Sequence, residues 1–333
     1  MIVGPIYRIP PVIIGSRVFL PSEVKDRKPW GLVERNVPKQ WRKTKGKGIT
    51  VAILDTGVWR HKDLPDPVFA WNATKQGSVF DKHGHSTHVA GIIGARLDGN
   101  GIVGWAPECN LACVKVLTDS GWGEDKWIAD GIRYAVNRGA HIINLSLGGK
   151  YSGIIGDAVR DAVKAGVVVI CAAGNEGPNP LTVASPASMR ETIAIGSYRQ
   201  DGRISSFSSR GPEVDFAFPG EKILSTFLNN SYRILSGTSM ACPAASGLAA
   251  LVLSSFEEKP DTEGIRKLFK SAAEDRGPKG KDYEFGWGIV DTSGVVRGGE
   301  SKKKLGKPIA ETEGAKIYPY KDGDKEGVLI LFD

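Results

Sequence analysis

Ser239 is the side chain that first suggests covalent chemistry in this sequence. It lies in the stretch 236–243 (SGTSMACP), which the small apolar run 244–253 follows at once. The Gly-Thr pair would deliver the serine onto the first turn of a buried helix, at the positive end of the helix dipole. A serine at a helix start is more often only a cap. A nucleophile therefore also needs a base, an orienting acid and an oxyanion donor elsewhere in the chain.

Three histidines, His83, His85 and His88, suggest a different chemistry, since H-x-H-x-x-H also occurs in metal sites. Metallo-hydrolases that use HxHxDH have an aspartate before the last histidine, where this chain has Thr87. Only two other histidines exist, and no further cluster of His or carboxylate ligands is obvious. We therefore favour a core hydrogen bond for His88 and a loop position for His83 over a zinc site.

Alternating strands and helices are predicted between these side chains. Short continuous apolar runs, typical of buried parallel strands, lie at 49–54, 112–117, 141–147, 167–173, 192–196 and 214–218. Helical patterns lie between them at 88–95, 127–137 and 155–165. This order predicts an α/β fold with a doubly wound, mostly parallel sheet and helices on both faces. Functional groups gather at the carboxyl ends of such strands, and Asp55, Gly148 and Asn175 all follow strand ends.

The two ends of the chain differ from this core. Residues 1–24 carry four prolines among Ile and Val, which predicts an extended segment packed on something else. After the serine helix, the pattern predicts a helix at 261–273 and a closing strand and turn at 285–291. The core is expected to end near Arg297. The tail is rich in Lys, Gly and Glu until the apolar run 328–332, which could add a strand or dock elsewhere.

Composition narrows the class of protein. Of the net charge of +7, residues 1–48 alone hold +8, which we ascribe to solvated side chains and not to nucleic-acid binding. No window reaches the 18 uncharged apolar residues of a membrane span, and the start lacks the pattern of a secretory signal, so we expect a cytoplasmic protein without membrane contact. The cysteines are expected as reduced core thiols: Cys109, Cys113, Cys171 and Cys242.

Three stretches, 55–57 (DTG), 84–91 (GHSTHVAG) and 237–241 (GTSMA), closely resemble the motifs of the subtilisin-like serine proteases, in that family's chain order. The resemblance runs from about Pro29 to Arg297. It implies that Ser239 is the nucleophile, His85 the general base and Asp55 the orienting acid. Asn175, in AAGNEG, matches the oxyanion-hole amide. The implied activity is broad-specificity endopeptidase action through an acyl-enzyme, without an organic cofactor. The alternative is a weak or inactive relative that binds peptides.

The resemblance also implies a peptide-binding cleft and departs from the family at a few positions. An extended substrate would add as a strand to the edge segment of Gly121, Trp122 and Gly123. The first specificity pocket would be lined by Ser146, Leu147, Gly148, Ala172, Ala173 and Gly174. Trp122 could shape an apolar rim, and Glu176 could favour a basic side chain. Ser86 replaces the usual glycine after the base, and AAS at 244–246 replaces a common HVA. All these residues are small, so we expect the site to survive.

A structural calcium ion is the cofactor that the resemblance implies. Asp63 and the loop 96–102 match the family's calcium site, with side-chain oxygens from Asp63 and Asp98 and loop carbonyls from Asn100 and Ile102. Hard oxygens in a glycine-rich turn suit calcium, although DGNG is also an ordinary turn sequence.

The short N-terminal extension points to one branch of the family, the intracellular subtilisins. We expect 1–24 to be an extension, 25–297 the protease domain and 298–333 a tail of unknown role. Members of this branch carry a Leu-Ile-Pro-Tyr-like motif that lies across the active site until it is removed, and RIPP at 8–11 shares its Ile-Pro. The extension is thus expected to be an intramolecular inhibitor of a zymogen. Proteins and peptides are the expected substrates, and a homodimer is compatible with this branch.

Overall fold

The computed structural model describes residues 6–19, 24–25 and 27–297, together with the backbone of strands within 310–332. The chain forms two compact units, Met1–Val296 and Arg297–Asp333. The smaller unit contains one antiparallel sheet with the order β15 (Ala310–Thr312), β16 (Ala315–Asp322) and β17 (Lys325–Phe332). The apolar run 328–332 is therefore a strand of this sheet.

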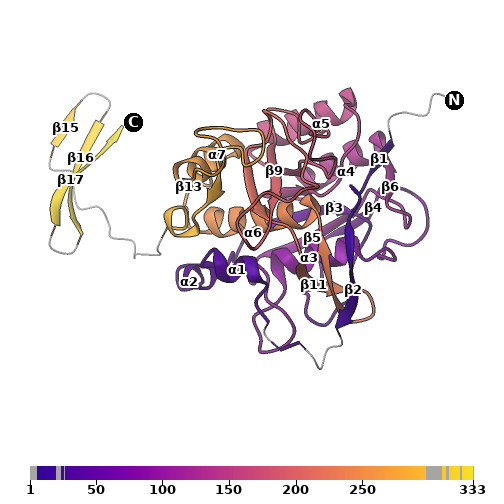
Figure 1. Cartoon of the computed structure of the whole chain (residues 1–333). Helices are drawn as coiled ribbons and strands as arrows, with labels where there is room; N and C mark the ends of the chain where they lie inside the picture. Colours follow the sequence, from indigo (N-terminus) through magenta and orange to yellow (C-terminus); the bar gives the residue numbers. More distant parts are fainter. Residues whose placement is uncertain are drawn as a thin grey trace. The chain divides into compact units, whose positions relative to one another are not determined.

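A nine-stranded sheet forms the centre of the larger unit (Figure 1). Its described neighbours are parallel except for the pair β13 and β14. The spatial order is β13 (Ala273–Glu274), β14 (Ile289–Val290), β10 (Phe216–Pro219), β9 (Ile193–Tyr198), β8 (Val168–Ala172), β7 (Ile142–Leu145), β3 (Thr50–Asp55), β5 (Asn110–Lys115) and β4 (Ala70–Asn72). The predicted doubly wound, mostly parallel sheet is confirmed.

Helices cover both faces of this sheet because its strands are apolar on both sides. Along β3, Val51 and Ile53 pack in one core cluster with α3 (His85–Gly94) and α6 (Thr238–Ser254). Ala52 and Leu54 pack in the other cluster, with α4 (Asp125–Asn137) and α5 (Gly153–Lys164). The remaining helices among the described residues are α1 (Trp30–Glu34), α2 (Val37–Gln40), α7 (Thr262–Ser271) and the 3-10 turn η2 (Thr292–Gly294). The continuous apolar runs of the sequence thus became strands buried from two sides.

The predicted elements agree with the structure except at a few boundaries. Helix α3 begins at His85, three residues earlier than the predicted 88–95. The closing strand and turn predicted at 285–291 are both present, with the strand at Ile289–Val290. Gly286 and Gly288 adopt φ of 62° and 120°, so the chain turns there before the strand begins. All four cysteines are buried and free, as predicted.

Two small sheets hold the N-terminal extension against the larger unit. Strand β1 (Ile6–Arg8) pairs antiparallel with β6 (Trp122–Glu124). Strand β2 (Ile13–Phe19) adds to the hairpin of β11 (Ile223–Phe227) and β12 (Ser231–Ser236), again antiparallel. Figure 1 shows both indigo strands against elements from later in the chain. The prediction of an extended segment packed on another surface is confirmed for the described residues 6–19.

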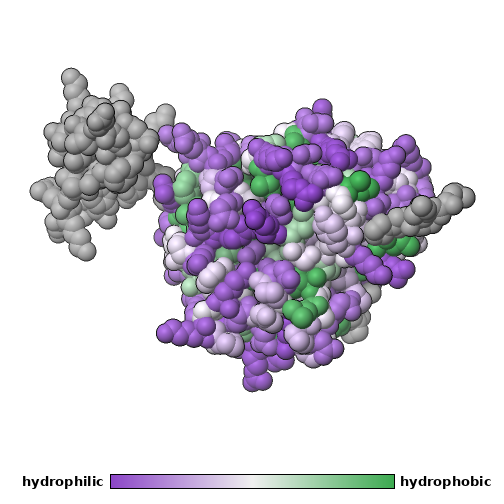
Figure 2. All heavy atoms as spheres, turned by 90° about the horizontal axis from the view of Figure 1, so that it is seen from above, coloured by the Kyte–Doolittle hydropathy of each residue, from purple (hydrophilic) through white to green (hydrophobic). Residues whose placement is uncertain are grey.

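Hydrophilic side chains cover most of the face drawn in Figure 2, and apolar residues appear there in separate patches. None of the helices in the described residues combines the length and the apolar composition that crossing a bilayer requires.

Candidate active site

Ser239 lies in the first turn of α6 and is completely buried. Pro243, four residues later in the same helix, has no N–H to donate to the Ser239 carbonyl. The Ser146 hydroxyl donates to that carbonyl instead, over 3.1 Å. The proline therefore leaves free an acceptor that ties the serine turn to the end of β7.

His85 begins α3 beside Asp55, the last residue of β3. Its Nδ1 is 2.9 Å from each Asp55 oxygen, and the two side chains are 2% and 0% exposed. Since a carboxylate only accepts, Nδ1 carries a proton and is the donor. In the neutral imidazole the lone pair is then on Nε2. Gly84 precedes the helix at φ 92°, where a Cβ would lie 2.4 Å from the Phe227 ring, so only glycine allows this close approach.

A second aspartate, Asp81, organises the turn that carries His85. Its Oδ1 accepts from the N–H groups of His83 and Gly84, each over 2.9 Å, and its Oδ2 accepts from the Thr87 N–H and hydroxyl. The Thr56 hydroxyl also donates to Oδ1 over 2.9 Å. Asp81 is a functional residue that the sequence patterns above did not identify. A carboxylate just before a helix start, four residues ahead of the base, is the signal that would have found it.

Thr56 links this turn to Asp55 from the other side. Its N–H donates to Asp55 Oδ1 over 2.7 Å, and its hydroxyl accepts from the Ser86 N–H over 3.1 Å. The buried Lys115 ammonium donates to the Thr56 carbonyl and, over 2.8 Å, to Asp119. Ser86, where the family usually has glycine, is accommodated with its hydroxyl 3.9 Å from the Cys113 sulfur.

Asn175 is fixed by its own carbonyl oxygen. Oδ1 accepts from both the N–H and the hydroxyl of Thr238, each over 2.9 Å. These two donors determine which side of the amide is oxygen, so Nδ2 faces the cleft. There Nδ2 donates to the carbonyl of Pro11 over 2.8 Å. The structure thus places a peptide carbonyl against the predicted oxyanion donor.

The serine and the imidazole are not hydrogen-bonded to each other in this arrangement. The Ser239 hydroxyl donates to the Ser146 carbonyl over 3.3 Å. His85 Nε2 is buried and has no hydrogen-bond partner within the described residues. Nε2 is therefore unengaged while the Ser239 hydroxyl is directed to Ser146.

The predicted peptide-binding segments are occupied by the extension itself. Arg8 exchanges two 3.0 Å backbone hydrogen bonds with Gly148, and the Ile9 N–H donates to the Gly121 carbonyl over 3.1 Å. On the same strand, Tyr7 lies opposite Gly123 and Arg8 opposite Trp122. Residues 6–9 thus lie between two strands of the cleft, as a bound peptide would.

The remaining pocket residues play different parts. Trp122 packs on Trp127 with 5.6 Å between ring centroids, and Glu176 is exposed. Leu147, Ala172 and Ala173 are fully buried. The Gly174 N–H donates to the Thr238 hydroxyl over 3.2 Å. No described hydrogen bond joins these last four residues to the extension.

Tyr7 is the most deeply held residue of the extension. Its side chain is 0% exposed and packs with the core cluster of α4 and α5. Its hydroxyl donates to the Lys150 carbonyl over 2.5 Å, and burial raises the pKa of Tyr7 to about 12. A Cβ on Gly149 would lie 3.0 Å from the ring, so the pocket wall is backbone.

Of the predicted calcium ligands, the structure brings Asp63 and the loop together. The Ile102 N–H donates to Asp63 Oδ2 over 2.8 Å, and a Cβ on Gly101 would lie 2.2 Å from that oxygen. Burial, then Asp63, then Asp98 raise the pKa of Tyr232, so both carboxylates lie near its hydroxyl. Asn100 is exposed, and its N–H donates to Asp98 Oδ1 over 3.1 Å.

His88 and His83 lie where the sequence predicted them. His88 is buried on α3, and its Nε2 is within 3.2 Å and 3.0 Å of the carbonyls of Ile223 and Arg233, to which it donates. His83 lies in the loop before the helix. Within the described residues, no group of three or more His, Cys, Asp or Glu side chains is arranged to hold a metal ion.

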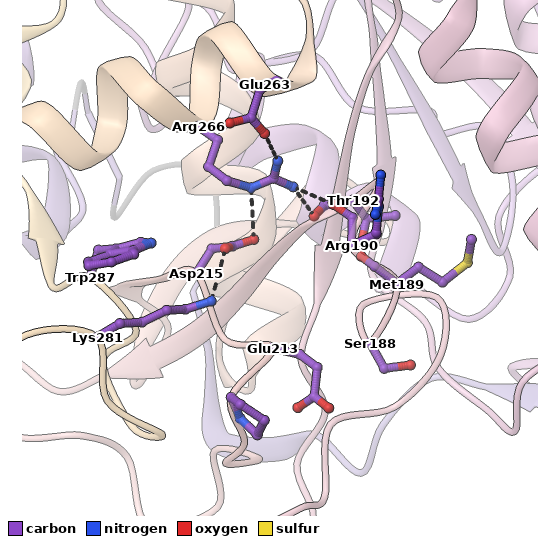
Figure 3. A pocket seen from close by; sticks show the side chains of 11 residues that line it. Ser188, Met189, Arg190, Thr192, Glu213, Asp215, Glu263, Arg266, Lys281 and Trp287 are labelled. Atoms are coloured by element: carbon purple, nitrogen blue, oxygen red, sulfur yellow. Dashed lines mark hydrogen bonds and ion pairs between the residues drawn. The ribbon is translucent and has the colours of Figure 1, made fainter.

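A hollow of about 500 Å³ lies elsewhere, beside α7 and β10 (Figure 3). Its wall contains Asp215, which is 3.5 Å from both Arg266 and Lys281. The Arg266 guanidinium also donates to the carbonyls of Arg190 and Thr192. Glu263 also accepts from Arg266, so two carboxylates balance the two cations. None of the four predicted catalytic side chains lines the hollow, and we assign it a structural role.

Comparison with known proteins agrees with this geometry. The family model described as "Subtilase family" matches residues 46–288. The chain is 41% identical over 265 residues to the "Major intracellular serine protease" of Bacillus subtilis (strain 168), covering 75% of this chain and 82% of that protein. It is 39% identical to the "Intracellular serine protease" of Paenibacillus polymyxa (72% and 77% covered) and 36% identical to "Subtilisin Savinase" of Lederbergia lenta (81% and 98% covered). The chain belongs to the subtilase family and is a subtilisin-like serine peptidase.

Proposed function

We propose that this chain is an endopeptidase that uses Asp55, His85 and Ser239 as its catalytic triad. One observation carries the proposal: Asn175 Nδ2 donates to the carbonyl of a peptide that runs through the cleft as a strand. The carbonyl of a substrate in that place would be polarised by Asn175 and attacked by the buried Ser239 hydroxyl. Its oxygen would become the oxyanion that the amide stabilises.

The proton steps follow from the tautomer of His85. Nε2 takes the serine proton as the Oγ–carbon bond forms, and Asp55 stabilises the imidazolium through Nδ1–H. His85 then returns the proton to the leaving amine as the peptide C–N bond breaks, which leaves an acyl-enzyme. Water attacks this ester in the reverse sense and regenerates Ser239.

Digestion of an unstructured protein tests this assignment, with the cleavage sites determined by mass spectrometry. Wild type should cut at many sites, and Ser239→Ala should cut at none. A serine-directed acylating reagent should label wild type stoichiometrically at Ser239. The arrangement in which Ser239 donates to Ser146 and not to His85 favours the second candidate function, a peptide-binding protein of little activity. Absent labelling together with tight peptide binding would support that candidate.

We further propose that the extension is an intramolecular inhibitor and that the chain is a zymogen. The support is the position of residues 6–11. They pair with the strand edges of the cleft, and the Pro11 carbonyl accepts from the predicted oxyanion donor, Asn175. The antiparallel register of Arg8 with Gly148, continued by two residues, would place Pro10 opposite Ser146. Asn175 holds the next carbonyl, that of Pro11. Whether the cleavage position is assigned from Ser146 or from Asn175, the residue that would be cleaved is a proline.

Proline explains why the extension would resist cutting. It has no N–H for the Ser146 carbonyl, and its φ is fixed near −65°. The Ser239 hydroxyl occupies that carbonyl instead and so stays away from His85. The two prolines therefore keep the nucleophile unengaged while the cleft is filled.

Intact-mass analysis alongside activity assays tests the zymogen. Purified Ser239→Ala should keep its N-terminus, whereas wild type should gain activity as the extension is lost. Replacing both Pro10 and Pro11 by alanine should shorten the delay before activity. A wild type that is fully active with its N-terminus intact would refute the inhibitor role and leave the triad assignment untouched.

We also propose a structural calcium ion held by Asp63, Asp98 and the carbonyls of Asn100 and Ile102. The support is the close packing of the Asp63 carboxylate against Gly101 of the loop. All four proposed ligands are oxygen atoms, which calcium prefers. Calcium should raise the Tm of Ser239→Ala, and a chelator should reverse the rise. Asp98→Asn should reduce the effect, and an equal response to magnesium would count against a calcium-selective site.

Given its relatives, we propose that the enzyme acts in intracellular protein turnover.

A further inference from the structure

The outer edge of β12 is covered by the same segment that fills the cleft. After Pro11 the extension continues as β2, with Ile13 opposite Ser236 and Phe19 opposite Tyr232. Strand β12 ends at Ser236, three residues before Ser239. The covered edge therefore begins at the nucleophile and leads away from it on the side where a leaving group would lie.

This edge is held rigidly by the helix that carries the catalytic base. The Ser225 hydroxyl donates to the His88 carbonyl and the Thr226 hydroxyl to the Thr87 carbonyl, each over 2.7 Å. His88 Nε2 in turn donates to carbonyls of both β11 and β12. All of these groups are buried or nearly so. Loss of β2 would remove none of these hydrogen bonds, so the edge is a preformed template for another strand.

Among the β2 residues whose burial the structure describes, one is a buried apolar anchor, and it lies at the far end of the edge. Ile13 is 58% exposed, and a Cβ on Gly15 would lie 2.7 Å from the Ile234 carbonyl. Phe19 is only 8% exposed, beside a hollow of about 220 Å³ whose wall includes Trp30 and Leu224. A bound strand would therefore be chosen by extension and length, with a preference for an aromatic residue where Phe19 lies.

We propose that the β12 edge binds the leaving-group half of an extended polypeptide substrate as a third strand. The proposal rests on the triad assignment above. Because Asn175 holds the Pro11 carbonyl, the leaving half would start at the place of Val12. Its second to eighth residues would then lie where Ile13 to Phe19 lie. The enzyme would thus act best on long unfolded chains.

Peptides with one constant acyl half and leaving halves of two, four, six, eight and ten residues test this on the active enzyme that the full chain yields. We expect kcat/KM to rise about tenfold from two to eight residues and then to level off, since each pairing adds a small net gain. An aromatic eighth residue should exceed alanine severalfold. A rate independent of leaving-half length would overturn the proposal.

Backbone N-methylation separates strand pairing from unspecific contact. In an edge strand only alternate N–H groups face the partner, so a methyl scan should lower kcat/KM at every second position on either side of the register shift between Leu235 and Arg233. Uniform losses, or none, would contradict pairing on β12. If enzyme whose extension has been lost, as checked by intact mass, cuts neither the shortest peptide nor an unstructured protein, the triad assignment itself fails, which is a different outcome.

Discussion

The catalytic centre and the segment that covers it are held in opposite ways. In the centre, each functional side chain has its own hydrogen-bond partners: His85 donates to Asp55, and Asn175 accepts from the N–H and hydroxyl of Thr238, all buried. In the cover, backbone holds backbone along β6, Gly148 and β12. Tyr7 and Phe19 are the buried aromatic anchors at either end.

This difference separates what must be permanent from what can be removed. A buried side-chain network loses a partner with every substitution, which leaves a polar group unpaired at a cost of roughly 1–3 kcal/mol. Backbone pairing accepts many sequences, so another peptide can replace the cover in the same place. The centre should therefore be intolerant of single changes, and the cover should depend on its anchors and prolines.

Asn175→Ala is the strongest test of the centre. It removes the donor to the oxyanion and the acceptor for Thr238, so kcat should fall about a hundred- to a thousandfold. This range is the known loss of kcat when such a donor is removed from a subtilisin. Enzymes already freed of the extension should be compared on one peptide. The exposed neighbour Glu176 offers the control, since Glu176→Gln should leave kcat unchanged. An equal loss in both variants would mean a fault of folding.

Acid should weaken the attachment of the β11–β12 hairpin to α3. Burial lowers the pKa of His88 to about 3, and its Nδ1 has no partner within the described residues. Below pH 6.5 His88 binds a proton in the unfolded chain but not in the folded chain. The free energy of unfolding therefore decreases as the pH decreases. Between pH 6.5 and 5 the loss should be about 2 kcal/mol.

Denaturant unfolding of Ser239→Ala, which cannot digest itself, measures this loss. His88→Gln keeps a donor for the two carbonyls but does not titrate, so its free energy of unfolding should depend less on pH. His61, whose pKa burial lowers to about 4, should leave part of the slope in place. A free energy of unfolding that is equal at pH 6.5 and 5 would show that His88 takes its proton in the folded state.

Tyr7→Ala tests the anchor of the cover. A synthetic peptide of residues 1–24 should inhibit the processed enzyme, and this change should raise its inhibition constant about ten- to a hundredfold, as expected for the loss of a fully buried ring. Ile13→Ala is the matched control, because Ile13 is 58% exposed and should matter little. If both changes weaken inhibition equally, Tyr7 is not an anchor of the cover.

How far the sequence predicts the molecule depends on the range of each signal. The buried strands could be predicted because continuous apolar runs such as 49–54 are local patterns. Asp55, His85 and Ser239 stood out because each lies in a short motif. Asp81 did not, because its role consists of contacts with five separate backbone and hydroxyl groups.

The position of the extension was the least predictable part. Its prolines predicted an extended segment, but pairing of β2 with β12 joins residues more than 200 positions apart. A strand edge is complementary to many sequences, so the partner follows from the folded surface. The tail likewise showed one apolar run, 328–332, whereas the strands β15 and β16 lack such runs and were not predicted.

Tyr7→Phe should have the smallest effect and decides how the anchor works. The hydroxyl stays protonated at working pH, because burial raises the pKa of Tyr7 to about 12, and its loss removes one hydrogen bond to the Lys150 carbonyl. Since such a bond contributes about 1 kcal/mol net, the inhibition constant of the 1–24 peptide should rise severalfold. A loss as large as that of Tyr7→Ala would mean that one polar contact holds the cover. The cover would then resemble the centre, and the contrast between them would fail.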